Sequence, residues 1–273
     1  MPPNASPNSQ DDKDVDDYIP SYLRRHVFPY QGDFCVAQSF HPALLAHLMV
    51  EGFLPIAAPG VLLPKLHQQR SVIQLPMHVS RNVRRKSKQW RVTLQQDFQG
   101  VVQGCQAQHG PNCWLYPVLV DSFAALHAEG LQTRFGMVRL YSVELWNEAD
   151  VLVAGELGYT VGDIYTSLTG FSSESSSGSV QLAVLGCLLE EHGFTLWDLG
   201  MDMDYKRDIG ATLMSRKEYV QRVQRVRESK ETVVLPTMAE PKNAREILDA
   251  KKASPDESMK DAQQAKPQAD AAR

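Results

Sequence analysis

The stretch that decides the fold spans residues 168–198 and begins with Leu168-Thr169-Gly170-Phe171-Ser172-Ser173. A serine-rich turn follows, then an apolar helix, and then the strand-like run Phe194-Thr195-Leu196-Trp197-Asp198. The pattern predicts strand, turn, helix and strand. The last strand carries one carboxylate, Asp198, in an otherwise apolar run. Because a charge on a buried strand is costly without a partner or a chemical task, we expect the functional site here.

The residues in and around this stretch show alternation typical of strands first and helical spacing afterwards. Residues 137–146, 151–161 and 163–171 read as consecutive strands. A helix over about 178–191, with Ser177 as its cap, and a last amphipathic helix over 215–227 follow. Antiparallel strands, a helix and a further strand that leaves an opening resemble the plan of an acetyltransferase-like (GNAT-type) domain. The pattern by itself predicts the mixed α+β class.

The residues before position 132 favour helices. Apolar side chains at helical spacing predict helices over 42–51 and 117–129, and Thr93 is the expected N-cap of another over 94–107. The segment 79–89 is short and basic, and strand-like runs lie at 71–75 and 90–94. We therefore expect this part of the chain to be mainly helical.

Composition divides the chain into four parts. Residues 1–17 are polar and acidic, so we expect a disordered N-terminus. An N-terminal α/β domain is predicted over 18–131 and an acetyltransferase-like catalytic domain over 132–228. Residues 229–273 are predicted to be a polar, mostly disordered tail, in which 243–252 suit a short helix and 232–236 form an apolar cluster that suits docking on the body.

Whole-chain composition excludes several classes of protein. The chain has 273 residues and a formal net charge of -4, so it is not basic throughout. Its four cysteines form no CxxC pair, which favours free thiols in a reducing compartment. No apolar run is long enough to cross a bilayer and no secretory signal precedes the body, so a cytoplasmic protein without membrane partners is expected. The histidines show no HExxH-like spacing, so no metal site is expected.

A basic segment is the second functional signal. Seven cations occur over 70–91 without one acidic residue. Of these, Arg81, Arg84, Arg85 and Lys88 fall near one helical face. Such a face suits the phosphate backbone of a nucleic acid, and an ordinary solvated helix is the alternative.

An ordered series of short motifs resembles one enzyme family. The series includes Gly52-Phe53-Leu54-Pro55, Arg70-Ser71-Val72-Ile73, His78-Val79-Ser80-Arg81, Gly104-Cys105, Trp114, His127-Ala128-Glu129-Gly130, Ser142-Val143-Glu144-Leu145-Trp146, Gly155, Gly158, Phe171-Ser172, Leu196-Trp197-Asp198 and Ile209-Gly210-Ala211. In this order and near this spacing the chain resembles the leucyl/phenylalanyl-tRNA–protein transferase family.

The resemblance implies a specific activity. The family moves Leu, Phe or Met from a charged transfer RNA to the N-terminal amine of a protein that begins with Lys or Arg, which creates a destabilising N-terminus. The fold implied is a small N-terminal domain with a larger acetyltransferase-like domain, and no metal, coenzyme A or other cofactor is used. Asp198 matches the active-site aspartate and is the expected catalytic residue that positions the acceptor amine. The basic segment matches the region associated with the RNA acceptor stem.

Recognition of the donor needs an apolar pocket. The candidates are Trp114, Phe171, Leu168, Gly170 and Trp197, and Leu185 is a further candidate. Trp114 matches a family tryptophan near the adenosine end of the donor. The alternative for each aromatic residue is an ordinary place in the core.

The chain departs from the family pattern at the chemical centre. Where the family has Asp-Cys-Gln, this chain has Asp198-Leu199-Gly200, so the glutamine is replaced by Gly200. The active-site glutamate of Gly-Glu-Ser-Met-Phe-Ser is replaced by Leu168, and the tryptophan after Phe-Pro by Ile56. Asp202, Asp204, Tyr205 and Lys206 are candidates to supply substitute polar groups.

Three functions remain open from the sequence. The first is an aminoacyl-tRNA–protein transferase with a modified centre, whose partners are aminoacyl-tRNA and an acceptor N-terminus. The second is a non-catalytic or re-specialised relative that binds transfer RNA or N-terminal peptides. The third is a small-molecule N-acyltransferase, although the serine-rich turn lacks the Q/RxxGxG/A pattern. The first function requires Asp198 to face the mouth of a cleft, with the basic surface on an adjoining wall.

Overall fold

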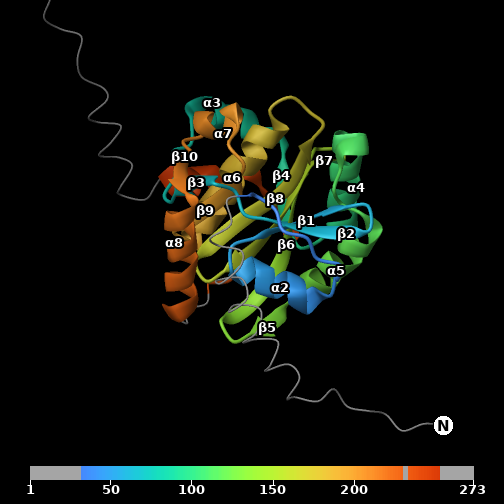
Figure 1. Ribbon diagram of the computed structural model, residues 1–273. Coiled ribbons are helices and arrows are strands. Elements are labelled where there is room, and N and C mark those ends of the chain that lie inside the picture. The colour runs from blue at the N-terminus through green and yellow to red at the C-terminus, as the bar shows by residue number, and fades with distance from the viewer. Residues whose placement is uncertain (1–31, 230–232, 253–273) are drawn as a thin grey trace, which may run out of the picture.

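One large sheet organises the chain (Figure 1). The computed structural model describes residues 32–229 and 233–252. Within these ranges nine strands form the sheet in the order β10-β3-β9-β8-β7-β6-β4-β11, with β5 paired to β6 beside this path. Its strands are β3 (Gln69–Gln74), β4 (Arg91–Leu94), β5 (Leu131–Thr133), β6 (Gly136–Trp146), β7 (Leu152–Val161), β8 (Ile164–Ser172), β9 (Leu196–Gly200), β10 (Thr212–Ser215) and β11 (Met238–Asn243). Neighbours are antiparallel except β8 and β9, which run parallel.

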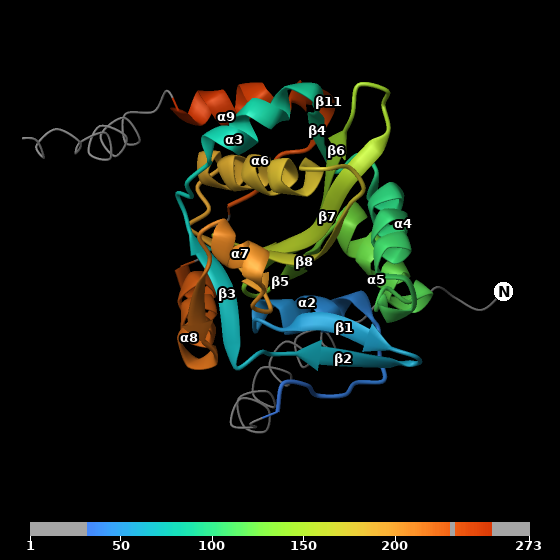
Figure 2. The ribbon, with the colours of Figure 1, turned by 90° about the horizontal axis from the view of Figure 1, so that it is seen from above.

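Helices cover both faces of the sheet, as Figure 2 shows from above. The helices are α2 (Pro42–Val50), α3 (Arg81–Lys86), α4 (Phe98–His109), α5 (Pro117–Ala128), α6 (Ser177–Glu191), α7 (Asp204–Asp208), α8 (Arg216–Ser229) and α9 (Ala244–Lys252). One face packs against α6, with α3 and α9 outside it. The other face packs against α4, α5, α2 and α8, and the hairpin of β1 (Leu54–Ala58) and β2 (Val61–Lys65) adjoins α2. We call these the α6 face and the α4 face.

Each face buries its own apolar core. The α4-face core contains residues from α2, α4, α5 and α8. The α6-face core contains residues from α6, from α9 and from the strands β4 and β6. Strands β3 and β4 come from the predicted N-terminal domain, yet they lie in the same sheet as β6 to β9. The predicted division at 131/132 therefore separates strands that share one sheet.

The strands and helices predicted from periodicity are confirmed over most of the body. Helix α2 starts at Pro42, where a proline fits because the first N–H groups of a helix need no partner within it. Strands β6, β7 and β8 match the predicted runs to within a few residues. These long elements position the site.

The first part of the chain has the predicted helices and the two predicted strand-like runs, which are β3 and β4, and it adds the β1–β2 hairpin, which was not predicted. It contributes β1 to β4 to the two sheets. Helix α4 starts at Phe98 rather than Leu94, because β4 continues to Leu94 and the Asp97 carboxylate caps the helix by accepting from the Gly100 N–H at 2.8 Å. Thr93 instead lies in β4, where its hydroxyl donates to the Glu144 carboxylate at 2.7 Å. The predicted cap Ser177 likewise lies inside α6, whose N-cap is Ser176.

Part of the predicted tail is folded. Strand β11 pairs with β4, and α9 packs on α6 and α3. Ala244 and Leu248 of α9 are fully buried, and Leu235 belongs to the α6-face core. The predicted helix over 243–252 is thus confirmed as α9, whereas a disordered tail over 233–252 is wrong. The predicted disorder of 1–17 and of 253–273 lies outside the described residues.

Candidate functional site at the divergence of two central strands

Strands β8 and β9 diverge in the middle of the sheet. They pair through Ile164↔Leu196, Tyr165↔Trp197 and Thr166↔Asp198. Beyond this point β8 continues to Ser172 along β7, whereas β9 ends at Gly200. Residues 167–171 are partly exposed, although β8 is a central strand. We call this divergence the opening.

A β-bulge shapes the β8 wall of the opening. Leu157 pairs with Thr169 and Gly158 pairs with Ser167, so Leu168 is the extra residue. The bulge turns Leu168 and Thr169 toward the same α4 face, where Leu168 packs on the core and the Thr169 hydroxyl lies 3.3 Å from His109 Nε2. Bulges re-aim side chains in this way and are frequent beside functional sites.

Three of the predicted donor-pocket residues share the α4 face. Trp114, Leu168 and Phe171 are partly buried and pack against the α4-face core. The Phe171 ring lies against α4, since a Cβ built at Gly104 would come within 2.4 Å of its Cε1 atom. The glycine at 104 is therefore required by this close approach. The three side chains thus pack on one core, and the Trp114 ring contacts Phe123 edge-on with their centroids 6.2 Å apart.

The other donor-pocket candidates lie on the α6 face. Trp197 is fully buried in the α6-face core, and its indole N–H donates to the Ser167 hydroxyl at 2.9 Å. Leu185 is fully buried in the same core. A Cβ built at Gly170 would lie 3.1 Å from the Glu156 Cβ atom. A side chain at position 170 would therefore point toward the α6 face, as Glu156 does. The sheet separates these residues from Trp114.

Asp198 does not face the mouth of a cleft, and that expectation is wrong. Its side chain is 0% exposed and forms an ion pair of 2.7 Å with Arg70 of β3, which is also 0% exposed. The Tyr219 hydroxyl of α8 donates to the same carboxylate oxygen at 2.8 Å, and the Gly200 N–H donates to the other oxygen at 2.9 Å. The carboxylate is therefore sealed inside the α4-face side of the sheet and cannot contact an acceptor amine in this structure.

Electrostatics explain why the pair is tolerated in the core. Burial by itself would lower the pKa of Arg70, yet the adjoining Asp198 carboxylate raises it above its ordinary value, so the guanidinium stays charged. Burial, reinforced by Asp198, also raises the pKa of Tyr219 well above its usual range, and this hydroxyl remains a donor. Arg70 further donates to the Gly52 carbonyl at 3.1 Å. The pair thus ties β3, β9, α8 and the end of α2 together.

The basic segment is partly a surface and partly core. Arg81, Arg85 and Lys88 are exposed, as predicted for phosphate contacts. Arg84 is only 7% exposed: its Nε donates to the Val79 carbonyl at 3.4 Å and its Nη1 to the Leu248 carbonyl of α9. The expected role of Arg84 on a phosphate-binding face is therefore wrong.

The basic segment lies beside the end of β8. Lys86 of α3 donates to the Ser176 hydroxyl at 2.8 Å, and Ser176 is the N-cap of α6, just after the serine-rich turn. This contact places Lys86 beside the N-terminus of α6. The Asp198 carboxylate is not at the mouth of a cleft, and the basic surface as an adjoining wall stays a prediction.

A polar cluster on the α6 face was missed by the sequence analysis. Glu156 of β7 is buried, and its carboxylate accepts from the Ser167 hydroxyl at 2.8 Å, the Tyr165 hydroxyl at 3.1 Å and the Gln181 amide at 3.1 Å. Burial raises the pKa of Glu156, and the three donors partly offset that rise. The signal was present, because Glu156 is a lone charge in an apolar strand, as Asp198 is.

The candidate substitutes after β9 have different surroundings. Lys206 is buried, and its Nζ donates to the Leu199 and Met201 carbonyls at 2.6 and 2.7 Å. Asp202 and Asp204 both pair with Arg207. Tyr205 is partly exposed, and so are the apolar side chains of Met201 and Met203. Only Lys206 is held inward, at the end of β9.

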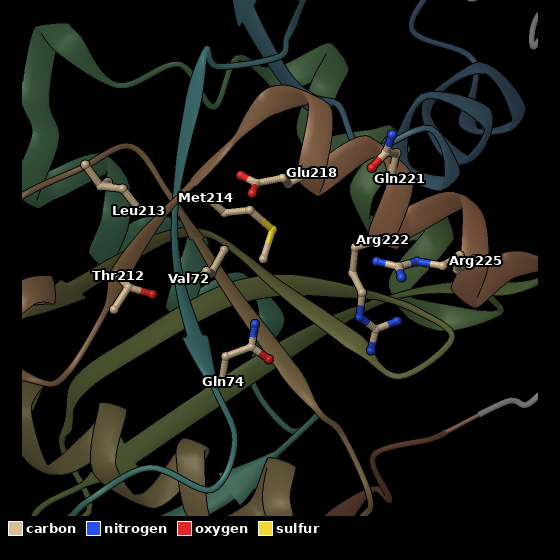
Figure 3. Close-up of a pocket in the computed structure, with 9 residues that line it drawn as sticks. All are labelled: Val72, Gln74, Thr212, Leu213, Met214, Glu218, Gln221, Arg222 and Arg225. Carbon is tan, nitrogen blue, oxygen red and sulfur yellow. The ribbon is translucent and has the colours of Figure 1, made fainter.

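A separate cavity of about 320 Å³ lies between α8 and the strands β3 and β10, of which β10 is at the edge of the sheet (Figure 3). It is lined by Val72, Gln74, Thr212, Leu213, Met214, Glu218, Gln221, Arg222 and Arg225. Arg222 is tied to Asp163 by an ion pair of 2.7 Å. This cavity includes none of the residues predicted for the site.

Comparison with known proteins agrees with the motif series. Residues 72–224 match the family model described as leucyl/phenylalanyl-tRNA protein transferase, which is more than half of the chain. The chain belongs to this family. The match includes α3, the bulged β8, and β9 with Asp198, whereas β11 and α9 lie outside it.

Relatives within the leucyl/phenylalanyl-tRNA protein transferase family are distant. A Leucyl/phenylalanyl-tRNA--protein transferase of Pseudomonas fluorescens (strain Pf0-1) is 30% identical over 52% of this chain, which spans 61% of that protein's length. One of Cereibacter sphaeroides (strain ATCC 17025 / ATH 2.4.3) is 29% identical over 67% of this chain and 83% of its own length. The solved structure of L-PGS from Bacillus licheniformis is 10% identical over 68% of this chain and 71% of that chain, with a TM-score of 0.38, too low to bear on the fold. None of the helices in the described ranges combines the length and apolarity that a bilayer crossing needs.

Proposed function

We propose that this chain is an aminoacyl-tRNA–protein transferase, which moves Leu, Phe or Met from transfer RNA to the N-terminal amine of an acceptor protein. Family membership supports the reaction class. The observation that carries the proposal is the opening itself: β9 pairs with β8 only as far as Thr166, Leu168 and Phe171 beyond that point pack on the α4-face core, and Lys86 of the basic segment contacts the N-cap of α6. The product is a protein marked for degradation by its new N-terminus, and the reaction belongs to the cytoplasm, where charged transfer RNA is available.

The acetyltransferase-like plan is part of this proposal. The parallel pair β8 and β9, joined by α6 and diverging after three ladder pairs, supports it. In such a plan the divergence leaves backbone N–H and C=O groups of a central strand without a ladder partner, and a substrate can use them. The donor ester would then lie along residues 167–171 of β8.

The donor side chain is assigned to the α4-face wall. Trp114, Leu168 and Phe171 offer apolar surface there. An apolar pocket discriminates one methylene by only about 1–3 kcal/mol, so several apolar donors should be accepted with graded rates. Trp114 remains the preferred single contact for the adenosine end.

Asp198 is assigned a positioning role rather than contact with the amine. Its carboxylate fixes the Gly200 N–H at the point where β9 ends, and Gly200 has a φ of 73°, a conformation that favours glycine. Arg70 and Tyr219 in turn hold the carboxylate. The geometry of the opening thus depends on Asp198 through the backbone.

Transfer RNA is assigned to the exposed cations Arg81, Arg85 and Lys88. A phosphate backbone gains affinity by releasing counterions when cations neutralise it. The contact between Lys86 and Ser176 joins α3 to the N-cap of α6, the helix that follows β8, and this supports a path from the acceptor stem to the donor ester.

A transfer assay tests the proposal. The full chain is incubated with transfer RNA charged with Leu, Phe or Met and with peptides bearing each N-terminal residue, and the peptides are weighed by mass spectrometry. We expect a mass gain equal to one apolar residue on peptides with basic N-termini, and none with uncharged transfer RNA. If no peptide gains mass with any charged transfer RNA, the proposal fails.

A second function is favoured by two features of the chain. The Asp198 carboxylate is sealed, and apolar Leu168 stands where the family has a glutamate, so the chain would bind transfer RNA or N-terminal peptides without transfer. Retention of charged transfer RNA on the protein with no product in the same assay would establish this reading. Acylation of small amines from coenzyme A thioesters would instead support an N-acyltransferase.

A further inference from the structure

Ser167 and Glu156 form a connected pair next to the opening. Ser167 is the first residue of β8 beyond the last ladder pair with β9, and it is partly exposed. Glu156 lies on the neighbouring strand β7 and is buried behind it. The 2.8 Å bond between the serine hydroxyl and the carboxylate therefore links the opening to a buried carboxylate.

Hydrogen-bond accounting leaves one position of the pair for a substrate. A serine hydroxyl has one proton and two lone pairs. Ser167 donates its proton to Glu156 and accepts from the Trp197 indole at 2.9 Å, so one lone pair remains. Gln181 and Tyr165 donate to the carboxylate and fix its orientation. The free lone pair of Ser167 can accept an N–H from an amine in the opening.

We propose that Ser167 and Glu156 accept the proton of the attacking amine in this chain. Ser167 is the catalytic residue that touches the amine, and Glu156 is a positioning residue that receives the proton through it. The inference rests on the proposed function, and it assigns a base to a centre in which Leu168 and Gly200 replace polar groups.

The step balances in atoms and charge. The neutral amine nitrogen attacks the carbonyl carbon of the donor ester, and a C–N bond forms. As the nitrogen becomes positive, its proton passes to Ser167 Oγ while the serine proton passes to Glu156. The bond between the carbonyl carbon and the 3′ oxygen of the transfer RNA then breaks. The proton returns from Glu156 through Ser167 to that oxygen, which restores the pair.

The charged groups around Glu156 define the expected pH dependence. Lys206 and Tyr205 of α7, Tyr165 of β8 and Cys105 of α4 are its titratable neighbours. Burial raises the pKa of Glu156, so the carboxylate form appears at higher pH than for an ordinary glutamate. Transfer should therefore rise with pH through that pKa, in addition to any rise from the acceptor amine.

Single-turnover transfer by variants tests the pair. Glu156→Gln and Ser167→Ala should each lower the rate by roughly 10²–10⁴-fold, with unchanged affinity for charged transfer RNA and loss of the lower limb of the pH profile. Ser167→Thr keeps the hydroxyl and should retain most of the rate. Glu148→Gln, which makes the same change at an exposed glutamate between β6 and β7, is the matched control.

The outcomes distinguish failure of the proposed role of Ser167 and Glu156 from failure of the proposed function. If the unaltered chain transfers and Glu156→Gln transfers at the same rate with the same pH profile, the pair is overturned and the transferase stands. If the unaltered chain transfers to no peptide, the proposed function falls and takes the role of the pair with it. Thermal melts of each variant show whether a lost rate reflects unfolding.

A thiol probe tests the geometry without any transfer. In Ser167→Cys, the pH dependence of alkylation by iodoacetamide gives the thiol pKa, and peptide mapping separates this thiol from Cys35 and Cys113. A carboxylate within hydrogen-bond reach should raise that pKa by about 1–3 units, so adding Glu156→Gln should lower it by the same amount. A thiol that does not react in the folded protein, or that has one pKa in both backgrounds, would overturn the pair.

Discussion

At the scale of single residues, Asp198 and Arg70 show how a buried ion pair holds separate elements of the fold together. Each is 0% exposed, and each depends on the other and on Tyr219. Removing two charges from water costs several kcal/mol per ion, and the attraction between them offsets that cost only in good geometry. The ion pair therefore matters most when one partner is missing.

Replacing Asp198 should destabilise the protein before it affects any chemistry. Asp198→Ala leaves the Arg70 guanidinium buried without its counterion and should lower the free energy of unfolding by about 3–5 kcal/mol. Urea denaturation followed by circular dichroism measures this. The double variant Asp198→Leu with Arg70→Met should recover much of the loss, because no buried charge is left. An unchanged urea midpoint for Asp198→Ala would contradict the structural role.

The sequence identified Asp198 as important but could not place it. Its partner Arg70 is 128 residues away along the chain, and no local pattern predicts that pairing. Leu168 is similar, because the bulge that turns it toward the α4 face exists only in the pairing of β8 with β7. The family motifs pointed to β9, whereas tertiary contacts decided which of its side chains are buried.

At the scale of elements, α9 changes the meaning of the basic segment. The Leu248 carbonyl of α9 accepts from Arg84, and the Arg84 carbonyl accepts from Arg245 at 2.7 Å. Arg84 thus fastens α3 to α9, while Arg85 remains on the surface. Neighbouring arginines in one short helix have separate tasks.

Substitutions of the two arginines should have different effects on transfer RNA binding and on stability. Arg85→Ala should flatten the slope of log affinity for transfer RNA against log salt by about 1 unit, since one phosphate contact is lost. Arg84→Met should leave the slope unchanged and lower the free energy of unfolding by about 1–3 kcal/mol, because buried acceptors lose their donor. Fluorescence anisotropy over a salt series and urea denaturation measure the two effects. A slope change in Arg84→Met equal to that in Arg85→Ala would refute the division.

Elements with strong periodicity were predictable, whereas the strands that contain proline were not. Helices α2 and α5 and strands β6 to β8 carry long apolar patterns. The hairpin β1–β2 was missed because Pro55 and Pro64 argue against strands, although the structure pairs these two residues with each other. Strand β11 was missed for the same reason, since it includes Pro241 among polar residues.

At the scale of the whole molecule, folding buries histidines as well as apolar residues: His67 is buried and His127 is partly buried. Burial, followed by the charges of Arg70 and Lys65, lowers the pKa of His67 to about 4. Burial and the charge of Arg139 lower the pKa of His127 to about 4. Both rings are therefore neutral in the folded protein at neutral pH.

Acidification should weaken the fold through these two histidines. Between pH 6.5 and about 4 the unfolded chain takes up protons at His67 and His127 while the folded chain does not, so stability falls as pH falls. The variant His67→Gln with His127→Gln should show a shallower loss of stability over this range in urea titrations. His78→Gln, at an exposed position, is the matched control. An identical pH dependence in the double variant and the unaltered chain would contradict this account.

The last strand of the sheet has a further consequence. Strand β11 covers the outer edge of β4 along Leu94, Val92 and Arg91, and it turns proline and charged side chains outward. Edges protected in this manner resist pairing with other chains. A version truncated after residue 229 would bare the β4 edge, and its molecules should join edge to edge into aggregates that light scattering detects.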